Sequence, residues 1–289
     1  MKVLSSDKHE AETLLGLRQF FRLNLGRWTE FYQKNTIYAW IYQERHATAV
    51  RYAGSLKLPA GSFVLDAGCG PGFTSIALAR GGSVVHPMDF LREMAAATCE
   101  LGRNAGVGDH VRPTVGDVTR LPFANEVFDL VVMLGVTEWV PPLDLLVSEA
   151  ARVLKPGGYL IIAWNNRWGL HLILDPVANP LLGRLRRFVR GVLERRGWIV
   201  PQPRGYLYTC KNFETAFRNH RLAILRARGI GFGPLSMMGL HLPETFGHKL
   251  NSCLQKAADT RMPFLQSVAR DYVVVACKVK TQRPRSQQE

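Results

Sequence analysis

The chain has 289 residues, of which 47% are hydrophobic, 10% aromatic and 21% charged, and its formal net charge is +14. This composition provides apolar material for a large core, and it excludes a disordered chain or a coiled coil as a description of the whole protein. Residues 165–230 carry thirteen Lys and Arg against three acidic residues, a local charge of +10. Such a charge attracts nucleic acid, anionic lipid or an acidic substrate without choosing among them.

The sequence gives no sign of membrane spanning or secretion. Its longest clean apolar run, 130–136, has the length of a strand rather than the roughly 18 residues that cross a bilayer. Charged residues predominate at positions 7–12, where a signal peptide needs an apolar segment, so we expect a cytoplasmic protein. Five cysteines without a C-x-x-C pair argue against a disulfide framework and against a structural zinc site.

In chain order, the pattern starts with a helical stretch and then alternates β-rich and helical runs. Residues 1–54 are predicted as a helical N-terminal cap, rich in aromatic residues, that covers a pocket or packs on the core. Predicted strands follow at 63–67, 83–88, 110–115, 128–134 and 159–164, with helices at 72–80, 90–102 and 143–154. Two later strands are predicted at 222–228 and 272–279, the second with the Val-Val-Val-Ala run of a strand buried on both faces.

This alternation is typical of βαβ units on a parallel sheet. We therefore predict an α/β domain at 55–280 with an insertion at 170–205. The polar tail at 281–289 is expected to fray.

A glycine-rich loop joins the first predicted strand to the next helix. Gly68, Gly70 and Gly72 let the backbone turn sharply and approach a ligand closely, where a Cβ atom would collide. A dinucleotide-binding loop has the spacing G-x-G-x-x-G, whereas the spacing here is G-x-G-x-G followed by Phe73. This departure argues against NAD as the ligand.

Two carboxylates each follow a predicted strand, as the binding site of a nucleoside requires. Asp89 lies 17 residues after Gly72 at the end of the second strand, where a carboxylate accepts hydrogen bonds from a ribose diol. Asp117 follows the third strand, where its side chain is placed to accept from an adenine amino group while the Val118 amide donates to the ring. Each alone fits a helix N-cap or a surface turn equally well, but their order along the chain favours the nucleoside site.

These pieces together resemble a known family, the class I S-adenosylmethionine-dependent methyltransferases, in its small-molecule branch. The matching stretches arrive in the family's order at 64–72, 89–94, 116–123, 128–140 and 152–158, so the resemblance covers about residues 55–165. It implies a doubly wound, seven-stranded, mostly parallel α/β sheet with a reversed last strand. It also implies S-adenosylmethionine as cofactor, bound at the carboxyl ends of the strands. His86 and Pro87, just before Asp89, depart from the family's usual apolar pair.

The resemblance implies a role for each matching residue. The methionine part of the cofactor is expected at Asp66, Gly68, Gly70 and Gly72 and at the backbone near Leu134, the ribose hydroxyls at Asp89, and the adenine at Asp117 and Val118. Methyl transfer from a sulfonium is an in-line displacement. The protein therefore aligns the reactants, excludes water and, for a hydroxyl acceptor, removes a proton.

The residues after the fourth and fifth predicted strands bear on the methyl acceptor. Methyltransferases of nucleic-acid amino groups resemble one another in an Asn or Asp followed by Pro-Pro and an aromatic residue, and cytosine C5 enzymes have Pro-Cys. The stretch 135–142 has neither, so a nucleic-acid acceptor is not favoured. The positions where a metal-dependent enzyme has acidic ligands are held by Leu134-Gly135 and Asn165-Asn166, so no magnesium site is expected.

A proton-accepting residue is harder to place. Glu138 and Trp139 are expected to line the pocket floor or to cap the next helix, and Glu138 is not assigned as a base. His171, just beyond strand five, is the candidate base because the unperturbed pKa of histidine lies near working pH. A structural role for this histidine is the alternative.

The predicted insertion contains a basic amphipathic helix at 181–196. Its apolar stripe consists of Leu181, Leu182, Leu185, Phe188, Val189, Val192 and Leu193, with Arg186, Arg187 and Arg190 opposite. Such a helix packs its stripe on the domain or lies in the interface of an anionic membrane. Its position resembles the insertion in methyltransferases of ubiquinone biosynthesis, which favours peripheral contact with a membrane.

The sequence thus predicts a methyltransferase that transfers a methyl group from S-adenosylmethionine to a small molecule, at oxygen, with a lipophilic or anionic acceptor. One alternative is an RNA or protein methyltransferase that binds its substrate through the basic stretch 165–230. Another is a noncatalytic lipid-binding or scaffold protein that retains the fold. The intact glycine loop and the carboxylates argue against the second alternative.

Overall fold

The computed structural model describes residues 16–30, 32–140, 142–183, 187–188, 191–192, 195–197, 205–237 and 240–280. Seven strands form one sheet in the order β3-β2-β1-β4-β5-β9-β6. The strands are β1 Phe63–Ala67, β2 Val84–Asp89, β3 Thr114–Val115, β4 Phe128–Met133, β5 Leu154–Asn165, β6 Leu222–Ile230 and β9 Asp271–Lys278. The first five pair in parallel, and β9 is antiparallel to both β5 and β6. The predicted doubly wound, mostly parallel sheet with a reversed last strand is therefore confirmed.

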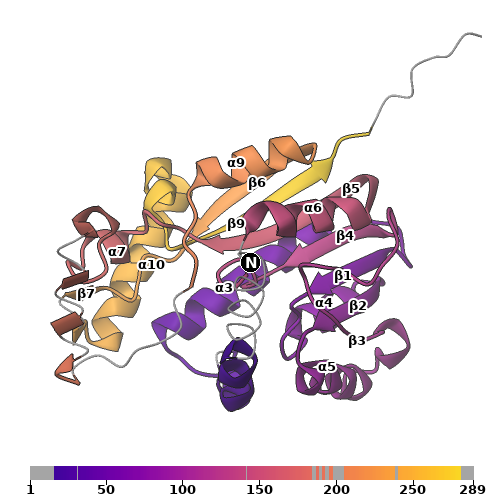
Figure 1. Cartoon of the computed structure of the whole chain (residues 1–289), viewed down its shortest axis with the longest axis horizontal. Helices are drawn as coiled ribbons and strands as arrows, with labels where there is room; N and C mark the ends of the chain where they lie inside the picture. The colour runs from indigo at the N-terminus through magenta and orange to yellow at the C-terminus, as the bar shows by residue number, and fades with distance from the viewer. Residues whose placement is uncertain are drawn as a thin grey trace, which may run out of the picture.

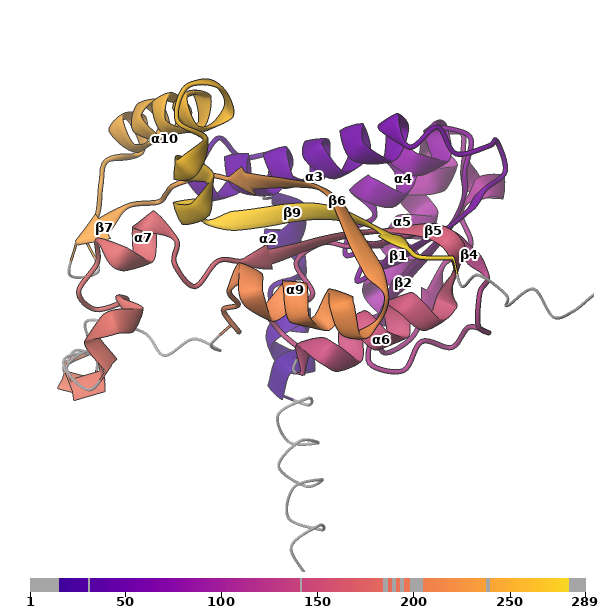
Figure 2. The same ribbon diagram turned by 90° about the horizontal axis from the view of Figure 1, so that it is seen from above.

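Helices cover both faces of this sheet. The helices of the described ranges include α2 Leu25–Glu30, α3 Ile37–Ser55, α4 Phe73–Arg80, α5 Arg92–Asn104, α6 Leu143–Val153, α7 Leu170–Ile173, α9 Cys210–Asn219 and α10 Glu244–Thr260. Figure 2 shows α3 and α4 on one side of the sheet and α6 and α9 on the other. Two separate apolar clusters result, because strands buried on both faces present one set of side chains to each layer of helices.

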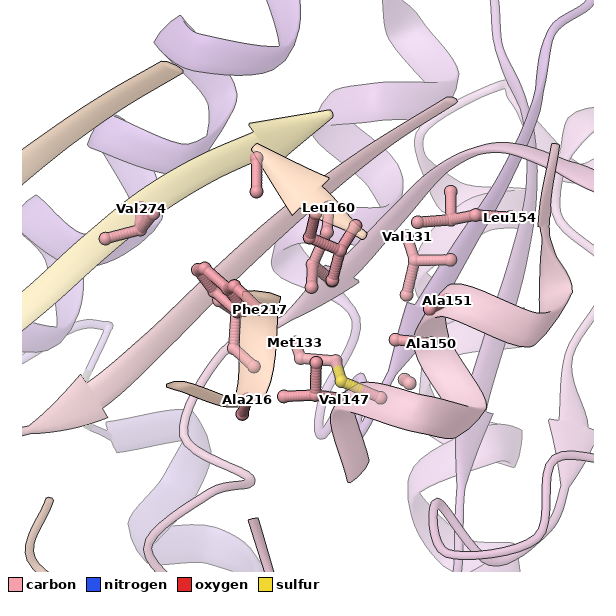
Figure 3. Packing of buried hydrophobic residues seen from close by; sticks show 14 of the residues in the cluster. Val131, Met133, Val147, Ala150, Ala151, Leu154, Leu160, Ala216, Phe217 and Val274 are labelled. Atoms are coloured by element: carbon pink, nitrogen blue, oxygen red, sulfur yellow. The ribbon is translucent and has the colours of Figure 1, made fainter. Parts of the chain in front are cut away.

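The cluster under α6 and α9 holds the central strands in place. Figure 3 shows Val147 of α6 and Phe217 of α9 beside Met133 of β4. Phe213 of α9 stacks on Trp164 of β5 with 3.8 Å between the ring centroids. Packing of this kind fixes β4 and β5, whose carboxyl ends carry residues of the candidate site.

The N-terminal helices pack on the sheet and contact α5. Helix α3 begins after Thr36, whose hydroxyl accepts a hydrogen bond from the Ala39 amide, and its residues Ile37 and Ile41 are buried in the cluster on its side of the sheet. Residues 16–23 are also helical, and the Arg22 guanidinium lies 2.9 Å from the carboxylate of Glu93 on α5.

The edges of the sheet and the C-terminal third differ from the predicted elements. The strand predicted at 110–115 is reduced to β3, because residues Gly108–His110 form a 3-10 turn, η1, and β3 pairs with β2 at only two positions. Helix α10 and the hairpin of β7, Ser236–Met237, and β8, Leu240–His241, have no counterpart among the predicted elements. Figure 1 shows α7, α10 and β7 at one end of the molecule and α5 and β3 at the other.

The predicted insertion is described in part. It contains α7 and the 3-10 turn η2, Pro180–Leu182, while residues 184–186, 189–190, 193–194 and 198–204 lie outside the described residues. The stripe residues Leu185, Val189 and Leu193 fall in that group, as do Arg186 and Arg190. No helix in the described ranges is long and apolar enough to cross a membrane. A further 3-10 turn, η3 Pro263–Val268, precedes β9.

Candidate functional site

A pocket lies at the carboxyl ends of β1, β2 and β4. Seven of the nine predicted site residues line it, namely Asp66, Gly68, Gly70, Asp89, Asp117, Val118 and Leu134. They come from four segments of the chain that meet at this edge because the carboxyl ends of parallel strands share one side of a sheet. The two predicted residues that do not line the pocket are Gly72 and His171.

The glycine loop after β1 is shaped by close contacts that only glycine permits. The amide of Gly68 donates to the carbonyl of Met88 at 2.7 Å, so the loop is tied to the end of β2. Gly68 has φ +78°, and a Cβ atom there would lie 2.3 Å from Val136 Cγ2. At Gly70, with φ +52°, a Cβ atom would meet nothing within 4 Å, so this part of the loop borders open space.

Asp89 and Asp66 are two buried carboxylates beside this loop. Asp89 accepts a hydrogen bond from the Gly70 amide at 3.1 Å and another from the Leu91 amide at 3.0 Å, and burial raises the pKa of its carboxyl. Asp66 accepts a hydrogen bond from the Ser75 hydroxyl at 2.6 Å. Burial, with a further contribution from the charge of Asp89, raises the pKa of Asp66 to about 6.

Asp117 stabilises a turn that follows β3 and borders the pocket. Its Oδ1 accepts hydrogen bonds from both the amide and the hydroxyl of Thr119, each at 2.8 Å. The next residue, Val118, is half-buried and packs against the core. The turn therefore presents a polar and an apolar group side by side.

Gly72 and His171 lie elsewhere. Gly72 precedes α4 with φ +89°, and a Cβ atom there would lie 2.5 Å from Thr98 of α5, so this glycine permits close packing of the two helices rather than lining the pocket. The His171 ring lies against Gly169, and its Nδ1 has no hydrogen-bond partner within the described ranges. Burial and the charge of Arg270 hold the pKa of His171 well below its usual range. Its predicted role as base therefore has no geometric support.

The N-terminal helices and the segments after β2 and β4 form an aromatic wall on the pocket. This wall consists of Phe21, Trp28, Phe90 and Trp139, which all line the pocket. The ring of Phe21 is 5.1 Å from that of Trp28, 5.2 Å from that of Trp139 and 5.5 Å from that of Phe90. Phe21 thus packs the N-terminal segment against the residues that follow β2 and β4 at the pocket.

Two buried charged residues, Arg45 of α3 and Glu138 after β4, complete the lining. Both are at most 6% exposed. A guanidinium nitrogen of Arg45 lies 3.5 Å from the carboxylate of Asp271, and the group sits 4.4 Å from the centre of the Tyr42 ring. Glu138 accepts a hydrogen bond from the side-chain amide of Asn165. The pocket therefore has a polar floor as well as an aromatic wall.

Comparison with known proteins identifies the family. A model described as a methyltransferase domain matches residues 65–162. The ubiquinone biosynthesis O-methyltransferase of Paracidovorax citrulli is 29% identical over 199 residues, which cover 68% of this chain and 79% of that protein. The protein of the same name from Bartonella bacilliformis is 30% identical over 186 residues, which cover 63% of this chain and 68% of that protein. The chain belongs to the class I S-adenosylmethionine-dependent methyltransferases.

As a member of this family the protein is an enzyme that uses S-adenosylmethionine, as its sequence predicts. The magnesium protoporphyrin IX methyltransferase of Synechocystis PCC 6803 shares the fold, with a TM-score of 0.59, 19% identity, and coverage of 92% of this chain and 99% of that one. Other relatives match less fully: the demethylmenaquinone methyltransferase of Lactobacillus johnsonii is 33% identical, but the match covers only 46% of its length.

Sequence reasoning missed Arg45 of this methyltransferase, although a signal was present. Arg45 stands four residues after Ile41 and four before Ala49, and both neighbours are buried. A charged residue in the middle of an apolar helical stripe is costly unless it is paired. That position was therefore a sign in the sequence of a polar site beneath the helix.

Proposed function

We propose that this methyltransferase transfers the methyl group to an oxygen atom of a small, lipophilic or anionic molecule. The observation that carries the proposal is a single pocket that combines the predicted cofactor residues with an aromatic wall and a buried carboxylate. The carboxylates of the lining suit the polar groups of a nucleoside cofactor, and the aromatic wall suits an apolar acceptor beside it.

The cofactor assignment rests on shape and hydrogen-bonding capacity. Gly68 and Gly70 leave a cradle without side chains, where the methionine part of S-adenosylmethionine fits beside Asp66 and the backbone of Leu134. Each oxygen of Asp89 accepts one amide hydrogen bond and so retains capacity for the ribose hydroxyls. Asp117 and Val118 are assigned to the adenine. When bound, the cofactor supplies an electrophilic methyl group on sulfur.

This assignment predicts a loss of affinity in Asp89→Ala. The variant should bind S-adenosylmethionine and S-adenosylhomocysteine more weakly by about 1–3 kcal/mol, because the buried ribose hydroxyls and the Gly70 amide lose their acceptor. Isothermal titration calorimetry measures this difference, with exposed Asp109→Ala as the matched carboxylate control. An unchanged affinity in folded Asp89→Ala, or competition by NAD, would contradict the assignment.

The nature of the acceptor is proposed from the rest of the lining. The aromatic wall favours a flat or apolar molecule, because aromatic side chains pack well on such surfaces. Relatives that carry the name O-methyltransferase support oxygen as the accepting atom. The division into an N-terminal cap, 1–54, and a catalytic domain, 55–280, belongs to this proposal, with the cap supplying much of the acceptor's surroundings.

A macromolecular acceptor bound through the basic stretch 165–230 is less well supported. Arg228 of that stretch lies 2.7 Å from Asp259 and also pairs with Glu44, so its charge is used within the fold. Arg226 donates to the Ser55 hydroxyl at 3.3 Å. Part of the local excess of positive charge therefore stabilises contacts between β6, α3 and α10 rather than forming an open face.

We further propose that residues 181–196 contact an anionic membrane. Six arginines against one glutamate give this stretch +5. Two of its described apolar side chains, Leu181 and Phe188, are 69% and 68% exposed, which leaves them accessible to lipid. A basic residue near an anionic leaflet contributes about 1 kcal/mol of attraction.

Sedimentation with vesicles tests this contact. Wild type should bind phosphatidylglycerol vesicles at low salt and release them as salt rises, since the Debye length falls to about 10 Å at 0.1 M. Phe188→Asp should weaken binding without lowering the melting temperature, because this side chain is exposed. The control is Leu225→Asp, another exposed apolar position, on β6. Equal sedimentation of wild type and Phe188→Asp, or no binding to anionic vesicles, would rule out the membrane contact.

A further inference from the structure

The segment after β4 places the carboxylate of Glu138 at the pocket floor. Gly135, with φ +74°, turns the chain there, and the Trp139 amide closes the turn by donating to the Val136 carbonyl at 2.9 Å. A Cβ atom on Gly135 would lie 3.4 Å from Glu138 Oε1. The carboxylate thus sits beside the backbone that follows Leu134, where the methionine end of the cofactor is proposed to bind.

One oxygen of this carboxylate is held by the protein, and the other has no hydrogen-bond partner among the described residues. Asn165 donates its side-chain N–H to Oε2. Oε1 accepts no hydrogen bond from the described residues. It is also not among the side-chain atoms that are both fully buried and unpaired, so it retains contact with the space of the pocket. Oε1 can therefore accept a proton or a hydrogen bond from a molecule in the pocket.

Buried polar groups surround Glu138 on several sides. They are Tyr42 and Arg45 of α3, Asn165 of β5, and Arg270 and Asp271 at the start of β9. Burial raises the pKa of Glu138 and the charge of Asp271 raises it further, while the charges of Arg45 and Arg270 oppose this rise. A carboxylate with a raised pKa accepts protons more strongly than a free glutamate, and the arginines keep its charged form accessible.

The neighbouring rings indicate which kind of hydroxyl would meet this carboxylate. Trp139 follows Glu138 directly, and Phe21 lies 5.2 Å from the Trp139 ring. Trp28 in turn lies 6.3 Å from Tyr42, which lies next to Arg45. The aromatic wall therefore continues to the charged floor, and an aromatic ring that packs on the wall brings a ring hydroxyl toward Glu138.

We infer that Glu138 is the catalytic base of this enzyme and that the acceptor is an aromatic hydroxyl, an inference that rests on the proposed function. The O–H bond of the acceptor breaks and its proton passes to Glu138 Oε1. The oxygen forms a bond to the methyl carbon as the bond from that carbon to sulfur breaks, and sulfur retains the electron pair as an uncharged thioether. Glu138 then releases the proton to solvent. Arg45 is a positioning residue, because its charge acts on Glu138 and keeps the carboxylate form of that side chain accessible.

Methyl transfer to a series of substituted phenols, with radiolabelled S-adenosylmethionine, tests the inference. For phenols that are protonated at the assay pH, Glu138→Gln should lower kcat about 10²- to 10⁴-fold, the usual contribution of a general base. For nitrophenols that are already ionised, the loss should be much smaller, because no proton has to be removed. Affinity for S-adenosylhomocysteine should change less than twofold, and His171→Gln should retain wild-type rates.

The pH dependence provides a second, independent measurement. In wild type the rate should rise with pH through the raised pKa of Glu138, and Glu138→Asp should retain this rise with a lower maximum. This readout applies even if Glu138→Gln does not fold. An equal loss of rate with protonated and ionised phenols, or an unchanged rate in Glu138→Gln, would overturn the inference alone. If wild type binds S-adenosylmethionine yet methylates no phenol, both the inference and the proposed oxygen acceptor fail.

Discussion

Asp66→Asn is expected to raise the free energy of unfolding at pH 8 by about 1–3 kcal/mol. The carboxyl of Asp66 is buried and its pKa is raised to about 6 from 3.8, so ionisation costs the folded state about 1.4 kcal/mol for each pKa unit. The contribution of this carboxyl to stability is complete below its unfolded pKa and is lost as pH rises through about 6. A neutral amide of the same shape avoids this loss and can still accept from Ser75.

Urea unfolding at pH 8 and pH 5 measures this effect. The difference between variant and wild type should fall to about half at pH 5, where the carboxyl is largely protonated in the folded state but still ionised in the unfolded state, and it should disappear only below the unfolded pKa of 3.8. The same variant should bind S-adenosylmethionine more weakly at pH 8, because the cationic methionine end loses a charged partner. Lower stability of the variant than of wild type at pH 8 would contradict the cost assigned to the ionised carboxyl of Asp66. Unchanged affinity for the cofactor would contradict its role in binding.

Gly68→Ala is expected to destabilise the enzyme by about 2–5 kcal/mol. Part of this cost, about 1–3 kcal/mol, comes from forcing an alanine into the left-handed region at φ +78°. A similar amount comes from the new Cβ atom, which would lie 2.3 Å from Val136 Cγ2 in a buried position. The loop tied to the end of β2 must shift to relieve this contact.

Two controls separate the contributions. Gly61→Ala has the same φ of +78° but nothing within 4 Å of the new Cβ atom, so it measures the backbone cost alone. Combining Gly68→Ala with Val136→Ala removes the steric contact, and a double-mutant cycle should give a favourable coupling energy of about 1 kcal/mol or more. Equal destabilisation by Gly61→Ala and Gly68→Ala would mean that the contact with Val136 has no energetic consequence.

The sheet and the side of the pocket proposed for the cofactor could be predicted from sequence because their signals are local. Alternation of apolar residues, the glycine spacing after β1 and the Val-Val-Val-Ala run of β9 each lie within a few residues of the element that they specify. Asp89 and Asp117 were placed at the pocket by their position after strands, since parallel strands present their carboxyl ends at one edge. Where β3 pairs over only two residues, the local pattern overestimated the strand.

The sequence by itself thus determined the fold class, the family and the segments that meet at the pocket. Only the tertiary structure decided which charged residues gather at the pocket floor and beneath it, because Arg45, Glu138 and Asp271 come from distant parts of the chain and meet where α3 packs across β5 and β9. The same packing leaves His171 outside the pocket and Glu138 within it, since residues 134–139 turn into the cavity whereas α7 directs the His171 ring toward Gly169. Sequence spacing has no information on such contacts, because they depend on the register of helices against the sheet rather than on neighbouring residues.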